Sequence, residues 1–162
     1  MVYLLFVYLH AFSAGAWGLN FLSDSILKSY IISNRNRNGE KKLIHIYIKF
    51  GSVIGLVSSL GILVTGIGMT LMNPAYRFFN FSSNHWLATK QILMILLLFV
   101  LVGFIIPTSK KIRIGLGSDF ESSSPISEEG YKNVQKLFKL NAIIYTIVLI
   151  NFLLGLTHNF FA

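Results

Sequence analysis

The sequence predicts an all-α integral membrane protein, a four-helix bundle with up-down topology. Hydrophobic residues make up 54% of the chain and charged residues only 12%, whereas charged residues are about a quarter of an average soluble protein. The apolar residues are gathered in four runs, each close to the roughly 20 residues that a helix needs to cross a bilayer. The 162 residues leave no room for a separate soluble domain, so we expect 1–162 to form a single transmembrane domain.

The first span is expected near Tyr3–Ile26 (3–26). It contains a histidine, His10, which is costly to place in an apolar span and is therefore a candidate functional residue. The span lacks the basic N-terminal region of a signal peptide, so we interpret it as a retained helix. Residues at helical spacing are predicted to form one stripe that faces the bundle: His10, Ala14, Trp17, Phe21 and Asp24.

The second span, near Tyr47–Leu71 (47–71), is rich in glycine and serine. Small residues let helices approach closely in lipid, so we interpret this span as a tightly packed central helix. The connector after it opens with Asn73-Pro74, a turn signal, and its aromatic side chains suit the membrane interface. The third span is expected near Trp86–Pro107 (86–107).

The fourth span is expected near Leu140–His158. Ser127 can cap a helix that begins at Glu128, which extends this last helix over 128–158. The Ser-rich, acidic stretch before it has the composition of a loop. Four amides inside the spans are interpreted as interhelical hydrogen-bonding groups rather than as a substrate path: Asn20, Gln91, Asn141 and Asn151.

The basic residues predict the orientation. Alternating spans place Arg77 and Lys90 on the same side as the two termini, and the other twelve of the fourteen Lys and Arg residues on the opposite side. Cytoplasmic loops carry the excess of Lys and Arg. The sequence therefore predicts a multi-pass protein of the bacterial inner (cytoplasmic) membrane with both termini on the outer, periplasmic, side.

The partners follow from the same pattern. The basic residues alternate with membrane spans instead of gathering on a soluble face, which is not typical of a nucleic-acid-binding protein. The expected partner is the lipid bilayer, with a homo-oligomer or a larger membrane complex as further possibilities. The chain has no cysteine, which excludes disulfides and cysteine nucleophiles, and it contains no GxSxG, P-loop or HExxH motif.

The outer side is predicted to collect the residues with functional chemistry. His10, His85 and His158 lie at the outer ends of three different helices, and neutral imidazoles bind haem iron, copper or zinc. The structural alternatives are an interhelical hydrogen bond for His10, an interfacial position for His85 and an exposed tail for His158.

The charges on this side are all positive. The six acidic residues fall on the opposite side, so Lys90 and Arg77 are predicted to face an anionic ligand such as the propionates of a haem or porphyrin. Alternatively, Lys90 reaches a lipid phosphate or the C-terminus. At 1.5 Å per residue, His10 and Lys90 are expected at similar depths.

Two short motifs resemble a group of small four-helix bacterial membrane proteins. The first is His10-x6-Trp17 followed by Gly18 and Phe21, and the second is Trp86-Leu87-x-x-Lys90. Together they resemble the HemJ-type protoporphyrinogen oxidases and the related CopD-like copper-resistance proteins. The segment from Phe138 to Asn141 is more weakly similar to the entry into the fourth HemJ helix. The resemblance covers the four-helix layout, with specific matches at these three places.

The HemJ resemblance implies a redox-linked protein that binds haem b through His10, with Trp17 in the same motif and Lys90 as a functional, catalytic residue. The enzyme implied is a porphyrinogen-oxidising oxidoreductase. The chain departs from the family at Asp24, where HemJ-type proteins carry an arginine shortly after the first motif. It departs again at residues 142–144, which lack the family's Glu-Pro pair. The chain therefore resembles a diverged member of this group.

Two other functions remain as alternatives. The CopD resemblance implies copper handling through His10, His85 and His158. The small-residue face of the second helix is also compatible with a non-catalytic small subunit of a larger membrane complex, docked through that face.

Overall fold

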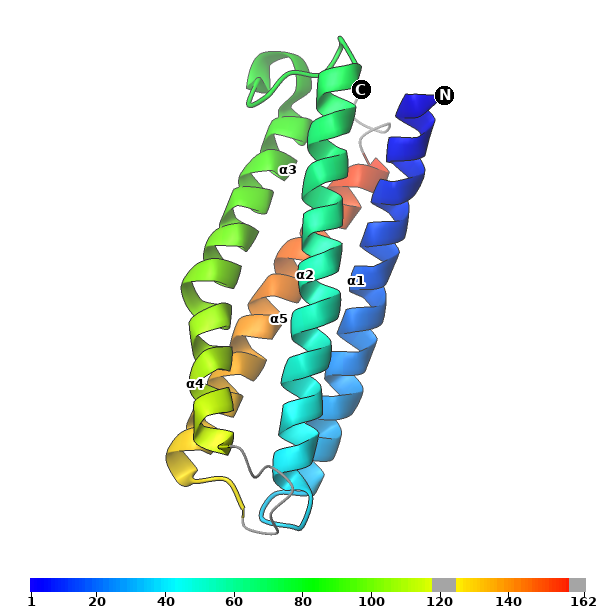
Figure 1. Cartoon of the computed structure of the whole chain (residues 1–162). Helices are drawn as coiled ribbons and strands as arrows, with labels where there is room; N and C mark the ends of the chain where they lie inside the picture. Colours follow the sequence, from blue (N-terminus) through cyan, green and yellow to red (C-terminus); the bar gives the residue numbers. More distant parts are fainter. Residues whose placement is uncertain (118–124, 158–162) are drawn as a thin grey trace.

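The computed structural model shows an all-helical bundle and describes residues 1–117 and 125–157 (Figure 1). Four helical rods alternate in direction along the bundle (Figure 1). Each is long and apolar enough to cross a membrane, as predicted. The elements are α1 (Val2–Ser33), α2 (Glu40–Met72), α3 (Phe81–Val100), the π-helical turn η1 (Leu101–Ile105), α4 (Ile106–Leu116) and α5 (Glu128–Thr157).

The two ends of the bundle are named here by residues that they contain. At the His10 end, α1 and α3 begin and α2 and α5 end (Figure 1). At the Arg35 end, residues 34–39 join α1 to α2, and α4 ends near the start of α5.

The helices are longer than the predicted spans. The first runs to Ser33 instead of Ile26, and the second begins at Glu40 instead of Tyr47. A helix of 32 residues is about 48 Å long, whereas the hydrocarbon core is about 30 Å thick. The extra turns exceed the length that a span needs and still pack, since Ile31 and Ile44 are completely buried.

The third rod was also predicted too short, because Pro107 does not end it. Proline has no N–H to donate to the carbonyl four residues earlier, and the helix absorbs this with a π-helical turn in which Ile106 N–H bonds to Leu101 O. The rod then continues as α4 to Leu116, which is buried at the Arg35 end. The last helix begins at Glu128 as predicted, where Ser127 Oγ accepts from Gly130 N–H at 3.1 Å.

An ionic clip joins three elements at the Arg35 end. The Arg35 guanidinium pairs with Glu40 at 2.8 Å and with Glu128 at 2.6 Å. Glu40 is 1% exposed and also accepts from the backbone N–H of Asn36 and of Ile126. A core of buried apolar side chains from every rod lies at the same end, so this end of the bundle is the closed end.

Helices α1 and α2 approach each other closely because two glycines of α2 make room. A methyl group at Gly61 would overlap Ser13, and one at Gly68 would overlap the ring of Phe6. This agrees with the predicted tight packing of the second span. The packing divides the bundle into an α1–α2 hairpin and an α3–α4–α5 hairpin, and the two hairpins enclose a cavity at the His10 end.

Candidate cofactor-binding site

A cavity of about 580 Å³ lies between the two hairpins at the His10 end. Its walls are mostly aliphatic and aromatic, with a few polar groups, which is the usual composition of a small-molecule site. Helices α1, α2, α3 and α5 and the connector between α2 and α3 all contribute to it. The residues that line it include Tyr3, His10, Gly66, Thr70, Tyr76, Phe79, Trp86, Lys90, Gln91, Asn151 and Gly155.

His10 is fixed by Thr65 of α2. Its Nδ1 lies 2.8 Å from Thr65 Oγ1. The hydroxyl hydrogen of Thr65 is donated to the carbonyl of Gly61 at 2.5 Å, so the oxygen can only accept from His10. The imidazole also has a hydrogen-bond contact with the backbone of Ile62. In the neutral tautomer that donates Nδ1–H to Thr65, the lone pair is on Nε2. In metal sites, a hydrogen bond of this kind from the ring nitrogen that does not bind the metal orients the histidine ligand.

Lys90 lies in the same cavity on the α3 side, within electrostatic range of His10. Its Nζ is packed against α5, 3.0 Å from the position that a Cβ on Gly155 would take. The Asn151 amide donates to the Lys90 carbonyl at 3.3 Å, and the Trp86 ring centre is 5.9 Å from the ammonium. The helices thus hold the half-buried cation between α3 and α5.

The described residues offer Lys90 no carboxylate. Both ion pairs found among residues 1–117 and 125–157 involve Arg35. The acidic residues within those ranges, from Asp24 to Glu129, belong to the half of the bundle that ends at Arg35. A cation held in an apolar environment is costly without an anionic partner. An anionic ligand in the cavity would provide one.

The connector between α2 and α3 forms one wall of the cavity. Phe79 has a positive φ of 52°, which is unusual for a bulky residue, and its N–H donates to Gln91 Oε1 at 2.7 Å. The hydroxyls of Tyr76 and Tyr3 are hydrogen-bonded to each other. Burial, followed by the charge and the hydrogen bond of Tyr3, raises the pKa of Tyr76 above its ordinary value. These contacts seat the connector on the ends of α1 and α3.

The other predicted site residues lie elsewhere. Trp17 is buried at 4% exposure and packs edge-on to Tyr145, but it does not line the cavity. Arg77 and His85 are exposed and do not line it either. His158 lies outside the described residues. Within those residues, no group of three or more His, Cys, Asp or Glu side chains could hold a metal ion.

The predicted bundle-facing stripe of α1 is largely present. His10 and Ala14 are half-buried, and Trp17 and Asp24 are buried. Phe21 is the exception at 49% exposure, although its ring contacts Tyr145 at a centroid distance of 5.2 Å. Three of the four amides form interhelical hydrogen bonds, as predicted: Asn20 to Tyr145, Asn141 to Asp24 and Asn151 to Lys90. Gln91 instead accepts from the Phe79 N–H of the connector that precedes its own helix.

A buried polar cluster that the sequence did not single out lies beneath the cavity. Asp24 Oδ1 accepts from the Tyr47 hydroxyl at 2.6 Å and from the Asn141 amide at 2.8 Å. The other Asn141 N–H reaches the Tyr47 hydroxyl at 2.7 Å. The sequence signal was an acid in the buried stripe of α1, but its partners come from two other helices and could not be read from spacing.

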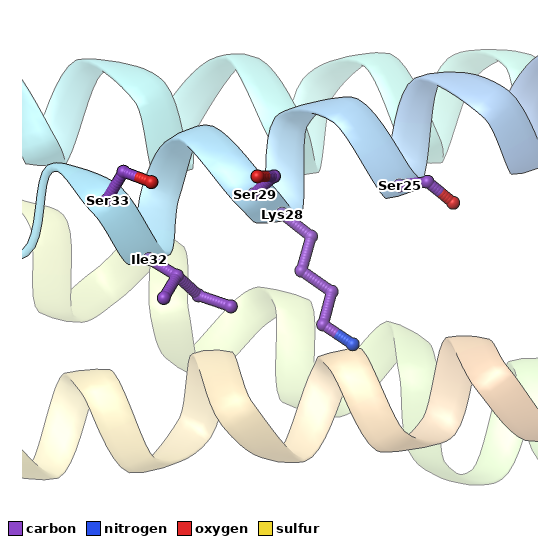
Figure 2. Close-up of a pocket in the computed structure, with 5 residues that line it drawn as sticks. All are labelled: Ser25, Lys28, Ser29, Ile32 and Ser33. Atoms are coloured by element: carbon purple, nitrogen blue, oxygen red, sulfur yellow. The ribbon is translucent and has the colours of Figure 1, made fainter.

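A second pocket, of about 380 Å³, lies along α1 toward the Arg35 end (Figure 2). It is a shallow groove lined by Ser25, Lys28, Ser29, Ile32 and Ser33. The Lys28 ammonium extends toward α5 (Figure 2) and lies 5.4 Å from the ring centre of Phe138. None of the predicted site residues lies in this groove.

Comparison with known proteins finds no matching family model, no similar curated protein and no similar solved structure.

Proposed function

We propose that the protein is a membrane-embedded haem- or porphyrin-binding protein whose site is the cavity between His10 and Lys90. The observation that carries the proposal is the position of His10 at the wall of an apolar cavity, with its Nδ1 held by Thr65. In the tautomer that donates Nδ1–H to Thr65, Nε2 carries the lone pair that an iron would take. Neutral imidazole is the usual protein ligand of haem b iron.

The donor set and the cavity fit such a group. The cavity volume, about 580 Å³, falls within the range of about 300–1,000 Å³ that small-molecule and cofactor sites occupy. His10 would hold the iron, the aromatic and aliphatic walls would cover the ring, and Lys90 would pair with a propionate. A bound haem would supply one-electron redox chemistry.

The resemblance to HemJ-type proteins adds the reaction class. If the protein is an enzyme, we propose that it oxidises a porphyrinogen and passes the electrons onward in the membrane. Lys90 is then the residue that holds the anionic edge of the substrate, and the apolar walls exclude water around it. The charge distribution supports a location in the bacterial inner membrane with the His10 end outside.

Copper handling has less support from the geometry. It requires His10, His85 and His158 to act together, and the exposed His85 is not a lining residue of the cavity that holds His10. A haem site requires one imidazole in an apolar cavity, which is the arrangement found.

The test is the visible absorption spectrum of the full chain, purified in mild detergent after expression in haem-replete cells. We expect a Soret band in the wild type and its loss in H10A. The exposed His85 provides the matched control, because H85A removes an imidazole from the same end of the bundle and leaves the cavity unchanged. A wild-type protein without a Soret band overturns the proposal, and so does an H10A variant that retains it.

The role of Lys90 is tested by K90R and K90M in the same preparation. Arginine keeps the positive charge that the propionate would require, whereas methionine keeps the apolar length of the chain without the charge. We expect haem affinity to fall in K90M and to be largely retained in K90R. Equal affinity in all three proteins would show that Lys90 does not contact the anionic edge. Metal analysis of the same samples shows whether copper is present instead of haem.

A further inference from the structure

Three buried polar atoms below the cavity have no hydrogen-bond partner. They are Trp17 Nε1, Ser58 Oγ and Ser59 Oγ. All three residues are deeply buried, with exposures of 4%, 1% and 2%. Buried side-chain N and O atoms are almost always hydrogen-bonded in proteins, and where protein partners are missing an ordered water usually takes their place.

The pairing of α1 with α2 places these atoms at one level of the bundle. His10 contacts Thr65, and Asn20 contacts Gly55, so the antiparallel register puts Trp17 opposite Ser58. At 1.5 Å per residue, Ser58 lies about 10 Å below Thr65 and about 4.5 Å above Gly55. The unpartnered atoms therefore lie between the His10 cavity and the level of Asn20.

The polar groups continue from there to Asp24. The Asn20 amide donates to the Tyr145 hydroxyl at 3.3 Å, and Asp24 lies one helical turn farther along α1. Its carboxylate is bonded to Tyr47 and Asn141 and also interacts with the Tyr145 hydroxyl. An acid within a membrane span is expensive and is therefore a functional residue by default.

We propose that these groups form an internal hydrated track along the α1–α2 seam, and that Asp24 is its proton-exchanging end. Water held by Trp17, Ser58 and Ser59 bridges the stretch between Thr65 and Asn20. A proton that enters from the cavity moves along the water and hydroxyl groups and binds the Asp24 carboxylate to give the neutral acid. Release is the reverse step, and no other bond is made or broken.

The surroundings of Asp24 allow this exchange. The titratable groups that face it are Tyr47 from α2 and Tyr145 from α5, and both are neutral hydrogen-bond partners. Lys28, one turn along α1, lies over the ring of Phe138 instead, and no ion pair of Asp24 is found among the described residues. The carboxyl group can therefore gain or lose a proton without breaking a salt bridge.

The hydrated track depends on the proposed function only for its role, which is to take up protons released in the cavity. Oxidation of a porphyrinogen releases protons together with electrons, and a carboxylate that is linked to the cavity by water can take up such a proton and return it to the cavity. The waters and the exchange at Asp24 do not depend on the identity of the ligand, so they can be tested separately from haem binding.

The hydration is tested by exchange of the Trp17 indole hydrogen into deuterated water in lipid nanodiscs, followed by NMR. The chain has two tryptophans, so W86F leaves Trp17 as the single indole signal. We expect this hydrogen to exchange although the side chain is buried, and we expect S58A and S59A to lose part of that exchange. If the Trp17 indole hydrogen stays protected from exchange in W86F, the hydrated track is ruled out, whatever the serine variants show.

The proton exchange is tested on the Asp24 carboxyl carbon. The chain has two aspartates, Asp24 and Asp119, so D119N with carboxyl-labelled aspartate reports on Asp24 alone, and D24N identifies the signal. We expect the signal to shift as the pH of the buffer changes, because the acid equilibrates with bulk water. A signal that is the same at every pH at which the protein stays folded overturns the role of Asp24.

The absorption spectrum of the wild-type protein in the same nanodiscs separates the two proposals, because Trp86 lines the cavity and W86F is used only to assign the indole signal. A Soret band with a protected Trp17 indole rejects the track and keeps the haem site. An exchanging indole without a Soret band rejects the haem site and keeps the track. D24N is expected to retain the Soret band, since Asp24 does not line the cavity.

Discussion

Thr65 has one hydroxyl hydrogen, and the Gly61 carbonyl accepts it. The oxygen therefore accepts from His10 Nδ1. Replacement by valine keeps the shape of the side chain but removes this acceptor, so the imidazole loses its orientation and its fixed tautomer. We expect T65V to weaken haem binding by about 10- to 100-fold, the usual effect of losing the group that orients a histidine ligand. Titration of the apoprotein with haem measures it.

A matched control for this variant is T70V. Thr70 lies on the same helix and lines the same cavity, but its hydroxyl bonds to the Gly66 carbonyl of its own helix. We therefore expect T70V to bind haem as the wild type does. If T65V and T70V bind haem equally well, Thr65 does not orient the imidazole.

The sequence could identify His10 and Lys90 but not their partners. An imidazole and an ammonium stand out in apolar spans because they are costly there. Thr65 does not stand out, since threonine is common in membrane helices and bonds to its own helix backbone. Its role depends on the register between α1 and α2, which Gly61 and Gly68 permit and which single-helix patterns do not contain. The partners of Asp24 could not be predicted for the same reason, because Tyr47 and Asn141 lie on other helices.

At the level of elements, the ionic clip formed by Arg35, Glu40 and Glu128 holds the loop between α1 and α2 to the start of α5. Glu40 is buried and accepts from Arg35 and from two backbone N–H groups. E40A would leave the guanidinium with the exposed Glu128 and both N–H groups without this partner. We expect a loss of unfolding free energy of about 3 kcal/mol, the lower end of the range for breaking a buried ion pair. Unfolding in mixed detergent micelles measures it.

The control for E40A is E129A. Glu129 is an exposed acid in the first turn of α5, and removing it changes the net charge by the same amount. Surface substitutions of this kind usually change the stability by less than about 0.5 kcal/mol. Equal losses in the two variants would mean that the clip does not stabilise the bundle.

The connector at the other end gives a prediction for alkaline pH. Burial comes first among the causes that raise the pKa of Tyr76 above 10.0, and Tyr3 adds to it. A group whose pKa is raised on folding stabilises the folded form below its unfolded pKa, and this contribution is lost as the pH rises through the folded pKa. We therefore expect the connector to stay seated at neutral pH and to loosen only at a pH above 10.0.

Absorbance titration of tyrosinate checks this prediction. Y76F should lack one late-ionising phenol, and Y3F should bring the ionisation of Tyr76 closer to the ordinary value without reaching it, because the burial remains. An unchanged titration curve in Y76F would contradict the assignment.

Most helix ends could not be predicted from the apolar runs. Apolar runs predicted which segments cross the membrane, but the helices continue into polar sequence because Lys, Arg and Glu are good helix formers. Pro107 was read as an end, whereas the π turn before it lets the rod continue. The start at Glu128 was predicted correctly because its cap is local: Ser127 contacts Gly130 within the same turn.

For the whole molecule, the two ends of the bundle are built differently. The Arg35 end has an apolar core and an ionic clip, and the His10 end has a cavity with an imidazole and an ammonium. The all-α bundle with four membrane-length helices was predictable from composition and runs alone, because each span carries its own signal.

The distribution of basic residues predicts the orientation of the bundle in the membrane. Arg77 and Lys90 belong to the His10 half, and the other twelve of the fourteen basic residues belong to the Arg35 half. Positive residues stay in the cytoplasm, so the His10 end and its cavity should face the periplasm.

The chain has no cysteine, which makes single introduced cysteines clean reporters. Ser82 is exposed at the His10 end and Asn38 at the Arg35 end. We expect a membrane-impermeant thiol reagent added to intact spheroplasts to label S82C, and to label N38C only after the membrane is permeabilised. The reverse pattern would place the cavity in the cytoplasm, where a ligand would enter from the other side of the membrane, while the haem site itself would stand unchanged.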